Sequence, residues 1–420
     1  MKLLHTADIH LGAKNYGRMD AETGLNTRLL DTRRSFDVMV KRALEEDIDL
    51  FLFCGDAYHT ADPTPTQQKI FAQCLQPIAD AGIPIVLIVG NHDHPVSHGK
   101  ASSLDIFPYL DGEVHLYRRP QLDVIETKSG PLQLIAMPWP IRSLILTKEE
   151  HRTKAPDELK AFIEQKYVAF IQSTAASIQA GEQGLSADVP TVMAGHLTVQ
   201  GAELAGSERT SLIARDPKFT VGQLAVPPID YVALGHIHQP QDRNAGHRPP
   251  VVYAGSIERV SFKERGEPKG FRLVRITHDD TEKVTATAFI ETPARSFVAV
   301  SVDARDAAAP TDVILQAIAK HDIEDAVVRV RYRIEEEQAP QVDTQRIRTA
   351  LKDAHVIASI ERTVDPAERK RRTVVTRDSD LEDAVRQYVS QHDELVNLED
   401  QMVTAALALE ERYETERRAD

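Results

Sequence analysis

Short apolar segments alternate with amphipathic helical patterns through the first part of this chain. The segments "KLLHTAD", "DLFLFCGD" and "IPIVLIVGNHD" read as buried strands. Between them, residues 28–47 and 64–82 place apolar side chains at helical spacing. An order of strand, helix, strand, helix and strand predicts a parallel sheet that is covered on both faces, with right-handed crossovers.

The pattern then changes twice along the chain. Strands and one polar helix, at about residues 157–180, predict a second sheet half, and a hairpin that ends near residue 291 closes the domain. The expected strands lie near residues 113–118, 132–139, 189–196, 230–238 and 251–260. From about residue 292 the order β-α-β-α-β predicts a small α/β domain. We therefore expect three parts: a two-sheet α/β sandwich flanked by helices (1–291), a small α/β domain (292–375) and a helical tail (376–420).

The expected tail is amphipathic and has no core of its own. Its apolar stripes are formed by Leu381, Val385 and Tyr388, and by Leu395, Leu398, Met402, Ala405 and Leu409. Such a segment at a chain end often docks on a helix of a partner. The alternative is that it packs back on its own chain.

Net charge, the length of apolar runs and the cysteine content exclude several classes of protein. A net charge of −14 argues against a free-standing DNA-binding module, although bound cations or a basic partner could supply positive charge. No apolar run reaches the roughly 18 residues that a membrane span needs, and the N-terminal apolar stretch is too short for a signal peptide. We therefore expect a cytoplasmic protein without membrane association. Cys54 and Cys74 form no disulfide framework or zinc pattern and read as buried hydrophobes.

Histidine and acidic residues recur where apolar segments end. Five motifs carry them: Asp8 and His10; Asp56 and His59; Asn91, His92, Asp93 and His94; His196; and His236 and His238. Any one motif could supply ordinary turn residues. Loops that follow the carboxyl ends of parallel strands meet at one sheet edge, where ligands bind. Five motifs at strand ends therefore predict one shared pocket.

The residue types in this pocket suit a pair of metal ions. Carboxylate, amide and imidazole ligands favour Mn²⁺, Fe²⁺ or Mg²⁺ over a thiolate zinc site. Two such ions roughly 3.5–4 Å apart activate a water and stabilise the charge of an in-line phosphoryl transfer. A bridging carboxylate and a neighbouring histidine acid would complete the chemistry.

The motif order D-x-H, G-D-x-x-H, G-N-H-D, G-H and G-H-x-H resembles the calcineurin-like metallophosphoesterase superfamily. The stretches "LLHTADIHLG", "GNHDHP", "MPWP" and "YAGSIERVSFKERGEPKGF" further resemble the SbcD family of nuclease subunits in bacterial SbcCD complexes. The resemblance implies a metallophosphoesterase nuclease domain, a DNA-facing capping domain and a tail that binds the SbcC partner.

The resemblance also implies roles for individual residues. One metal would be bound by Asp8, His10, Asp56 and His238, and the other by Asp56, Asn91, His196 and His236. His92 would protonate the leaving group or steady the phosphate, and His59 would orient the DNA phosphate nearby. Asp93 would support a histidine from behind the ligands.

The activity implied in this way is that of a nuclease with two Mn²⁺ ions, or with Mg²⁺ or Fe²⁺ in their place. It would act on double-stranded DNA ends, hairpins and single strands in end processing, recombination and repair. Its partners would be a second copy of the chain and two SbcC subunits, which are SMC-like ATPases with a long coiled coil. Two alternatives remain open: a small-substrate phosphodiesterase of the same superfamily, and a non-catalytic scaffold that tethers DNA ends.

Overall fold

The computed structural model describes residues 1–94, 101–141, 155–206, 216–278, 282–365, 381–390 and 393–419. The chain divides into two compact units. The first comprises Met1–Val302, Thr311–Tyr332 and Thr344–Glu361. The second comprises Asp303–Pro310, Arg333–Asp343 and Arg362–Asp420.

The first sheet of the larger unit has the strand order β14-β13-β1-β2-β3-β4. Its strands are β1 (Lys2–Thr6), β2 (Leu50–Phe53), β3 (Ile85–Ile88), β4 (Val114–Tyr117), β13 (Gly270–His278) and β14 (Lys283–Glu291). Strands β1 to β4 are parallel, and the β13–β14 hairpin pairs antiparallel with β1. The expected hairpin that closes the domain therefore joins this first sheet.

The second sheet has the strand order β11-β12-β10-β7-β6-β5. Its strands are β5 (Gln121–Thr127), β6 (Gly130–Met137), β7 (Thr191–His196), β10 (Tyr231–Gly235), β11 (Gln241–Asp242) and β12 (Val251–Tyr253). Strands β6, β7, β10 and β12 are parallel to one another. A short parallel pair, β8 (Thr198–Val199) and β9 (Lys218–Phe219), follows β7.

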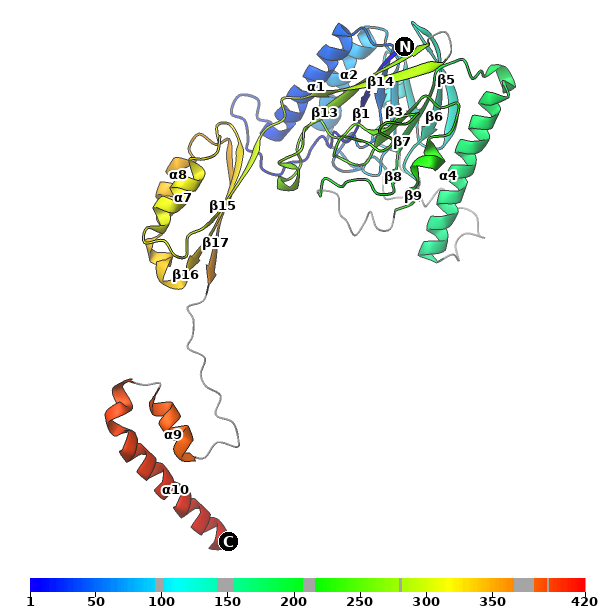
Figure 1. The fold of residues 1–420 in the computed structure, drawn as a ribbon. Coiled ribbons are helices and arrows are strands. Elements are labelled where there is room, and N and C mark those ends of the chain that lie inside the picture. Colours follow the sequence, from blue (N-terminus) through cyan, green and yellow to red (C-terminus); the bar gives the residue numbers. More distant parts are fainter. Residues whose placement is uncertain are drawn as a thin grey trace. The chain divides into compact units, whose positions relative to one another are not determined.

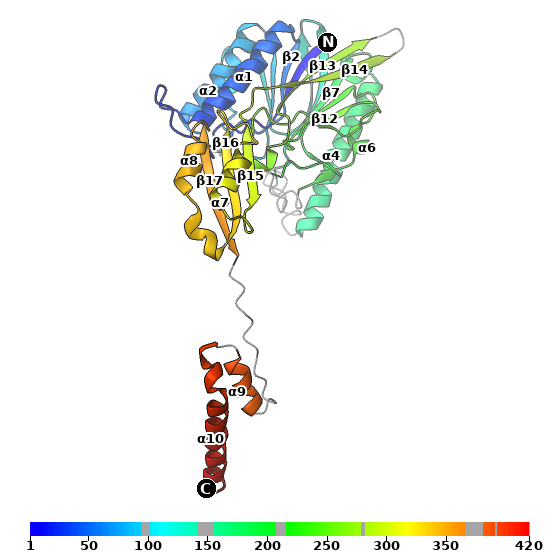
Figure 2. The ribbon, with the colours of Figure 1, turned by 60° about the vertical axis from the view of Figure 1, so that its left-hand side comes forward.

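Helices cover the outer face of each sheet, as Figures 1 and 2 show. Helix α1 (Thr27–Glu45) packs Phe36 against Phe51 of the first sheet, and helix α2 (Pro65–Asp80) packs Phe71 against Phe53. Helix α4 (Pro156–Gln179) buries its apolar side chains on the second sheet, and the short helix α6 (Val221–Leu224) follows β9 in the chain. The inner faces of both sheets form a further apolar core between them. The predicted two-sheet α/β sandwich is confirmed.

Local sequence explains where these helices begin. Asn26 caps α1 by accepting a hydrogen bond from the backbone N–H of Arg28. Thr64 and Gln67 form a reciprocal capping box at the start of α2, and a proline occupies the first turn. Gly82, just beyond α2, has a φ of +69° and ends the helix.

A three-stranded sheet follows the sandwich in sequence, with the order β15-β16-β17. Its elements alternate as expected: β15 (Phe297–Asp303), α7 (Pro310–Ile318), β16 (Val327–Glu335), α8 (Thr344–Ala350) and β17 (Val356–Asp365). Helices α7 and α8 lie on one face of this sheet (Figure 1). The boundaries expected at residues 291 and 375 stay a prediction.

The tail contains α9 (Leu381–Val389), a 3₁₀ segment (Asp393–Leu398) and α10 (Glu399–Ala419). The side chain of Arg386 joins α9 to α10 through an ion pair with Glu399 at 2.9 Å. Tyr388 is 52% exposed and Leu409 is 65% exposed. Large apolar side chains therefore stay in solvent on both helices. Among the helices that the structure describes, none combines the length and apolar character of a membrane span.

Two strand expectations need correction. Residues 114–117 were expected in the second sheet but pair with β3 in the first. The strand expected over 251–260 ends at Tyr253, and the following residues form loops and a short 3₁₀ turn, η4 (Phe262–Glu264). Strand β5, which pairs with β6, lacks a continuous apolar run, because three of its seven residues are exposed and only one is fully buried, and it was not predicted.

Gly235, at the end of β10 in the second sheet, lies against residues that follow β1 and β2 of the first sheet. A Cβ atom there would lie 2.0 Å from the carbonyl oxygen of Cys54 and 2.8 Å from the Cβ of Ala7. We expect Gly235→Ala to lower the free energy of unfolding by about 1–3 kcal/mol, because the backbone must shift to admit the methyl group. Urea unfolding in EDTA measures this, with Gly266→Ala as the control, since a Cβ at Gly266 meets nothing within 4 Å. Equal stability of both variants would contradict the prediction.

Candidate metal centre

Backbone hydrogen bonds hold together the loops that leave the strands. The N–H of Asp8, after β1, donates to the carbonyl of Gly55 at 2.9 Å, and the N–H of His10 donates to the carbonyl of Asp56 at 3.1 Å. Both carboxylate oxygens of Asp8 accept from the N–H of His236, after β10, at 3.0 Å. Loops from the two sheets therefore meet at one edge, as expected for the carboxyl ends of parallel strands.

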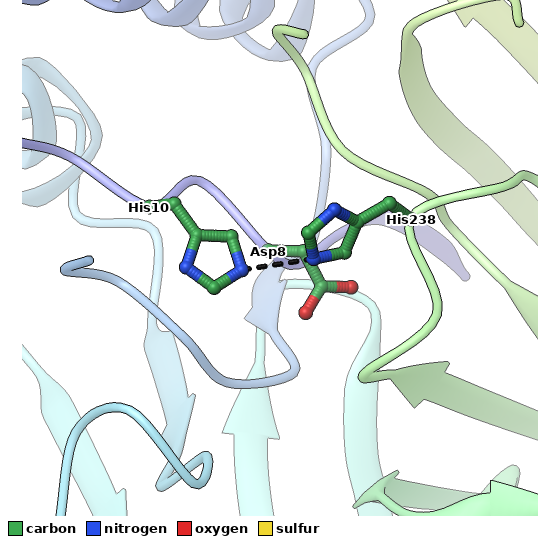
Figure 3. A group of neighbouring side chains, drawn as sticks. All are labelled: Asp8, His10 and His238. Carbon is green, nitrogen blue, oxygen red and sulfur yellow. Dashed lines mark hydrogen bonds between the residues drawn. The ribbon is translucent and has the colours of Figure 1, made fainter. Parts of the chain in front are cut away.

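A first group of donor atoms comes from Asp8, His10 and His238 (Figure 3). All three residues are buried, and one potential ligand atom from each lies within 4.8 Å of the others. The Nε2 atoms of His10 and His238 face each other at 2.9 Å. Residues separated by 228 positions thus present two imidazole nitrogens and a carboxylate to one point.

Asp56 lies between this group and a second one. Its Oδ2 atom is 3.7 Å from Nε2 of His10 and 3.4 Å from Nε2 of His196. Its Oδ1 atom accepts a hydrogen bond from the backbone N–H of His92 at 2.8 Å. One oxygen of this buried carboxylate therefore faces histidines from both sheets.

The second group gathers around the amide oxygen of Asn91. This Oδ1 atom lies 3.0 Å from Nε2 of His196 and 3.1 Å from Nδ1 of His236. The other ring nitrogen of His196 contacts the carbonyl of Cys54 at 2.7 Å. The carbonyl fixes a proton on Nδ1, so Nε2 is the ring nitrogen of His196 that faces Asn91 and Asp56 and could bind a cation once it is deprotonated.

His92 and His59 lie beside the first group. The ring of His92 is 4.7 Å from that of His10 and 5.9 Å from that of His59, measured between centroids. Nδ1 of His92 contacts the carbonyl of His59 at 2.8 Å, which leaves Nε2 as its second functional nitrogen. Both side chains are half-buried, as Asn91 is, in contrast to the buried aspartate and histidine ligand candidates.

Asp93 organises the loops through backbone donors. Its carboxylate accepts from the N–H groups of Asp56 at 2.8 Å, Ala57 at 2.9 Å and Gly90 at 3.0 Å. The sequence predicted that Asp93 supports a histidine side chain, but among the described residues no hydrogen bond joins the Asp93 carboxylate to a histidine ring. Burial raises the pKa of Asp93 to about 6, and the nearby charge of Asp56 contributes to the same rise.

The backbone of the site adopts unusual conformations. Asp8, His10, Asp56 and His236 have φ values of +53°, +46°, +60° and +95°. Such angles cost non-glycine residues on the order of 1–3 kcal/mol each and cluster at functional sites. A Cβ at Gly90 would lie 2.2 Å from Oδ1 of Asp56, so only glycine admits this carboxylate.

The titration behaviour of the buried groups reflects their crowding. Burial raises the pKa of Asp8 to about 7. Burial alone would lower the pKa of His196. The negative charge of Asp56 and the hydrogen bond between the two side chains have the larger effect and raise the pKa of His196 to about 9. Burial likewise opposes ionisation of Asp56, yet His196 holds its pKa well below the usual range. A proton on His196 therefore balances Asp56, and cations that bind these atoms would displace protons.

The donor set fits hard divalent cations. Carboxylate oxygens, an amide oxygen and imidazole nitrogens converge without any thiolate, which is the ligand preference of Mn²⁺, Mg²⁺ and Fe²⁺. Nδ1 of His10 is buried and has no hydrogen-bond partner among the described residues. Such a polar atom is typical of functional sites.

Sequence reasoning missed three residues of this region. The carboxylate of Glu264 contacts Nδ1 of His238 at 3.0 Å, and that of Asp216 lies 3.5 Å from Nε2 of His236. The ring of Trp139, the only tryptophan of the chain, lies 4.9 Å from the ring of His236. Trp139 and Glu264 stand within stretches noted above for their resemblance, but no motif spacing linked them to the histidines.

The chain resembles known proteins in sequence. It is 26% identical over 295 residues to SbcD of the nuclease SbcCD from Escherichia coli (strain K12), with 68% of this chain and 67% of that protein covered. It is 30% identical over 283 residues to SbcD of the nuclease SbcCD from Bacillus subtilis (strain 168), with 65% and 66% covered. The sequence resemblance to SbcD proteins is thereby confirmed over about two thirds of each chain.

A solved structure and a family pattern complete the comparison. A dimetal phosphatase from Danio rerio has 9% identity and a TM-score of 0.39, with 68% of this chain and 98% of that one covered, which is too distant to bear on the reaction. Residues 1–240, which include all five motifs, match the calcineurin-like phosphoesterase family. This chain therefore belongs to the calcineurin-like phosphoesterase family.

Proposed function

We propose that this chain is the nuclease subunit of an ATP-dependent SbcCD-type complex and hydrolyses DNA phosphodiesters with two Mn²⁺ ions. The observation that carries the proposal is the position of Asp56. Its Oδ2 atom faces His10 of one donor group and His196 of the other. A carboxylate shared by two cations is what a two-metal phosphodiesterase requires. The names of the relatives favour DNA as the substrate.

In this proposal, one cation is held by Asp8, His10, Asp56 and His238, and the other by Asp56, Asn91, His196 and His236. When bound, the cations would lower the pKa of a water and offset the charge on the phosphate oxygens. Mg²⁺ or Fe²⁺ would satisfy the same oxygen and nitrogen donors.

The remaining steps belong to side chains near the donor groups. In its imidazolium form, His92 would donate the proton of Nε2 to the leaving oxygen and keep on Nδ1 the hydrogen that it donates to the carbonyl of His59. The ring of His59 stacks on that of His92 and would orient the DNA phosphate beside it. Asp93 keeps the Asp56 and Gly90 loops in register.

The proposed assembly follows from the resemblance and from the exposed apolar side chains of the tail. Two copies of this chain and two SbcC ATPases would form a heterotetramer that acts on DNA ends and hairpins in the cytoplasm, in association with the nucleoid. The small α/β domain would act as the DNA-facing cap. The ATPase would supply positive charge that the chain, at −14, lacks.

The tail is proposed to bind the ATPase because it exposes apolar side chains on both of its described helices. We expect deletion of the residues after about 376 to leave a folded nuclease that no longer captures the ATPase in a pull-down. Thermal unfolding should show that the shortened chain keeps the stability of the sandwich. Unchanged capture of the ATPase would contradict this role and favour packing of the tail on its own chain.

The direct test compares two substrates in Mn²⁺. A labelled DNA hairpin, with and without the ATPase, is the expected substrate, and bis-p-nitrophenyl phosphate represents small diesters. Rapid turnover of the small diester without DNA cleavage would favour a small-substrate phosphodiesterase. Elemental analysis after Mn²⁺ loading tests the remaining alternative, because near-zero metal would indicate a non-catalytic scaffold.

A further inference from the structure

A buried ion pair lies directly behind His238. Glu264, at the end of η4, is fully buried, and its Oε1 atom contacts Nδ1 of His238 at 3.0 Å. Its Oε2 atom pairs with the Nζ atom of Lys269 at 2.8 Å. Both charged side chains are excluded from solvent, in a position where desolvation opposes ionisation.

Lys269 is held by several partners around the same histidine. Its Nζ atom donates to Oγ of Ser256 at 3.0 Å, to a carboxylate oxygen of Glu267 at 3.1 Å and to the carbonyl of His238 at 3.4 Å. The N–H of Ser256 also donates to the carbonyl of His238 at 3.1 Å. The pair therefore contacts both the ring and the backbone of His238.

Buried ion pairs are seldom a source of net stability, because apolar residues of similar volume often stabilise the same position equally well. Neutral acceptors also suffice to orient a histidine, as the carbonyl of Cys54 does for His196 at 2.7 Å. The placement of a carboxylate and its own cation behind His238 thus calls for a role other than packing.

We propose that Glu264 is a positioning residue for the metal centre and that Lys269 holds it in place. Glu264 keeps the proton of His238 on Nδ1, so the Nε2 lone pair points to the space shared with His10 and Asp8. A carboxylate in this position also makes the imidazole a stronger ligand, and loss of such partners costs about 10–100-fold in metal affinity. The inference rests on the proposed two-cation site.

The test measures Mn²⁺ binding to the full chain by electron paramagnetic resonance, which distinguishes free Mn²⁺ from bound and spin-coupled pairs. Glu264→Gln keeps an oxygen beside Nδ1 of His238 but removes the negative charge that makes the imidazole a stronger ligand. We therefore expect it to weaken one of the two sites about 10–100-fold and to abolish the spin-coupled signal at moderate Mn²⁺. The control is Glu267→Gln, which alters a partner of Lys269 without contact to the ring of His238 and should bind both ions normally.

A double variant, Glu264→Leu with Lys269→Met, separates positioning from stability. Replacing the whole pair leaves neither Glu264 nor Lys269 as an unpaired buried charge, and Glu267 keeps 14% of its side chain exposed to solvent. The fold should therefore stay close to its original unfolding temperature, while one Mn²⁺ site stays weak. Should this variant fail to fold, Glu264→Gln answers the question, because it preserves the shape of the side chain.

Each outcome bears on a separate statement. Wild-type protein that binds fewer than two ions contradicts the proposed function itself. Wild-type protein that binds two ions, together with folded Glu264 variants of unchanged affinity, overturns the positioning role and leaves the metal centre standing.

Discussion

Asp56→Asn should abolish DNA cleavage while the sandwich stays folded. The carboxylate is the group that faces both donor clusters, at 3.7 Å from Nε2 of His10 and 3.4 Å from Nε2 of His196. An asparagine keeps an oxygen that can accept from the N–H of His92, so the loop geometry should survive, but the negative charge that the two proposed cations would share is lost. Removing one preorganised electrostatic group typically costs about 10²–10³-fold, and a shared ligand should cost at least about 10³-fold.

Hairpin cleavage and Mn²⁺ binding, measured on the same preparation, check this expectation. Asp111→Asn is the control, because this exposed aspartate precedes β4 and lies outside the donor clusters. The variant Asp56→Asn should lose cooperative binding of the second ion as well as cleavage. Two tightly bound ions with undiminished hydrolysis would show that Asp56 does not bridge them.

The second large effect is expected from His92→Asn. The variant should bind both ions yet cleave DNA about 10²–10⁴-fold more slowly, which is the usual contribution of a general acid. The backbone N–H of His92 makes the hydrogen bond to Asp56, so the change of side chain leaves that contact intact. His115→Asn, at a residue whose ring pairs with Glu113, is the control.

The leaving group separates the two roles that His92 can have. If its Nε2 protonates the leaving oxygen, the loss should be much smaller for a p-nitrophenyl diester, whose leaving group needs no proton. If the ring only contacts the phosphate, the variant should cleave DNA and the p-nitrophenyl diester more slowly by the same factor. Cleavage of DNA at the wild-type rate would mean that neither role is correct.

Much of the fold was predictable because buried parallel strands are continuous apolar runs. Residues 50–53 and 85–88 stand out in this way, and the polar residues after them mark the edge of the sheet. The sequence did not predict which sheet a strand joins, as residues 114–117 show. An apolar run indicates a buried strand but does not indicate which strands pair with it. The half-exposed β5 lacked even that signal.

The candidate site was partly predictable for a similar reason. Aspartate and histidine after apolar runs are local patterns, and the structure brings Asp8, His10, Asp56, His196 and His238 together as donor groups. Glu264 is one of 64 acidic residues, and only its tertiary contact with a histidine 26 positions away distinguishes it. Such a partner is defined by packing and has no local signature.

The left-handed backbone angles at Asp8, His10, Asp56 and His236 bear on how the site forms. These loops keep their disfavoured backbone conformation because the flanking strands and the hydrogen bonds to Asp93 hold them there. The protein fold therefore arranges the candidate metal ligands before a cation binds. Side chains that are already in place lose little conformational entropy when an ion binds. The rigid packing of the two sheets should therefore increase the affinity of the site for a metal ion.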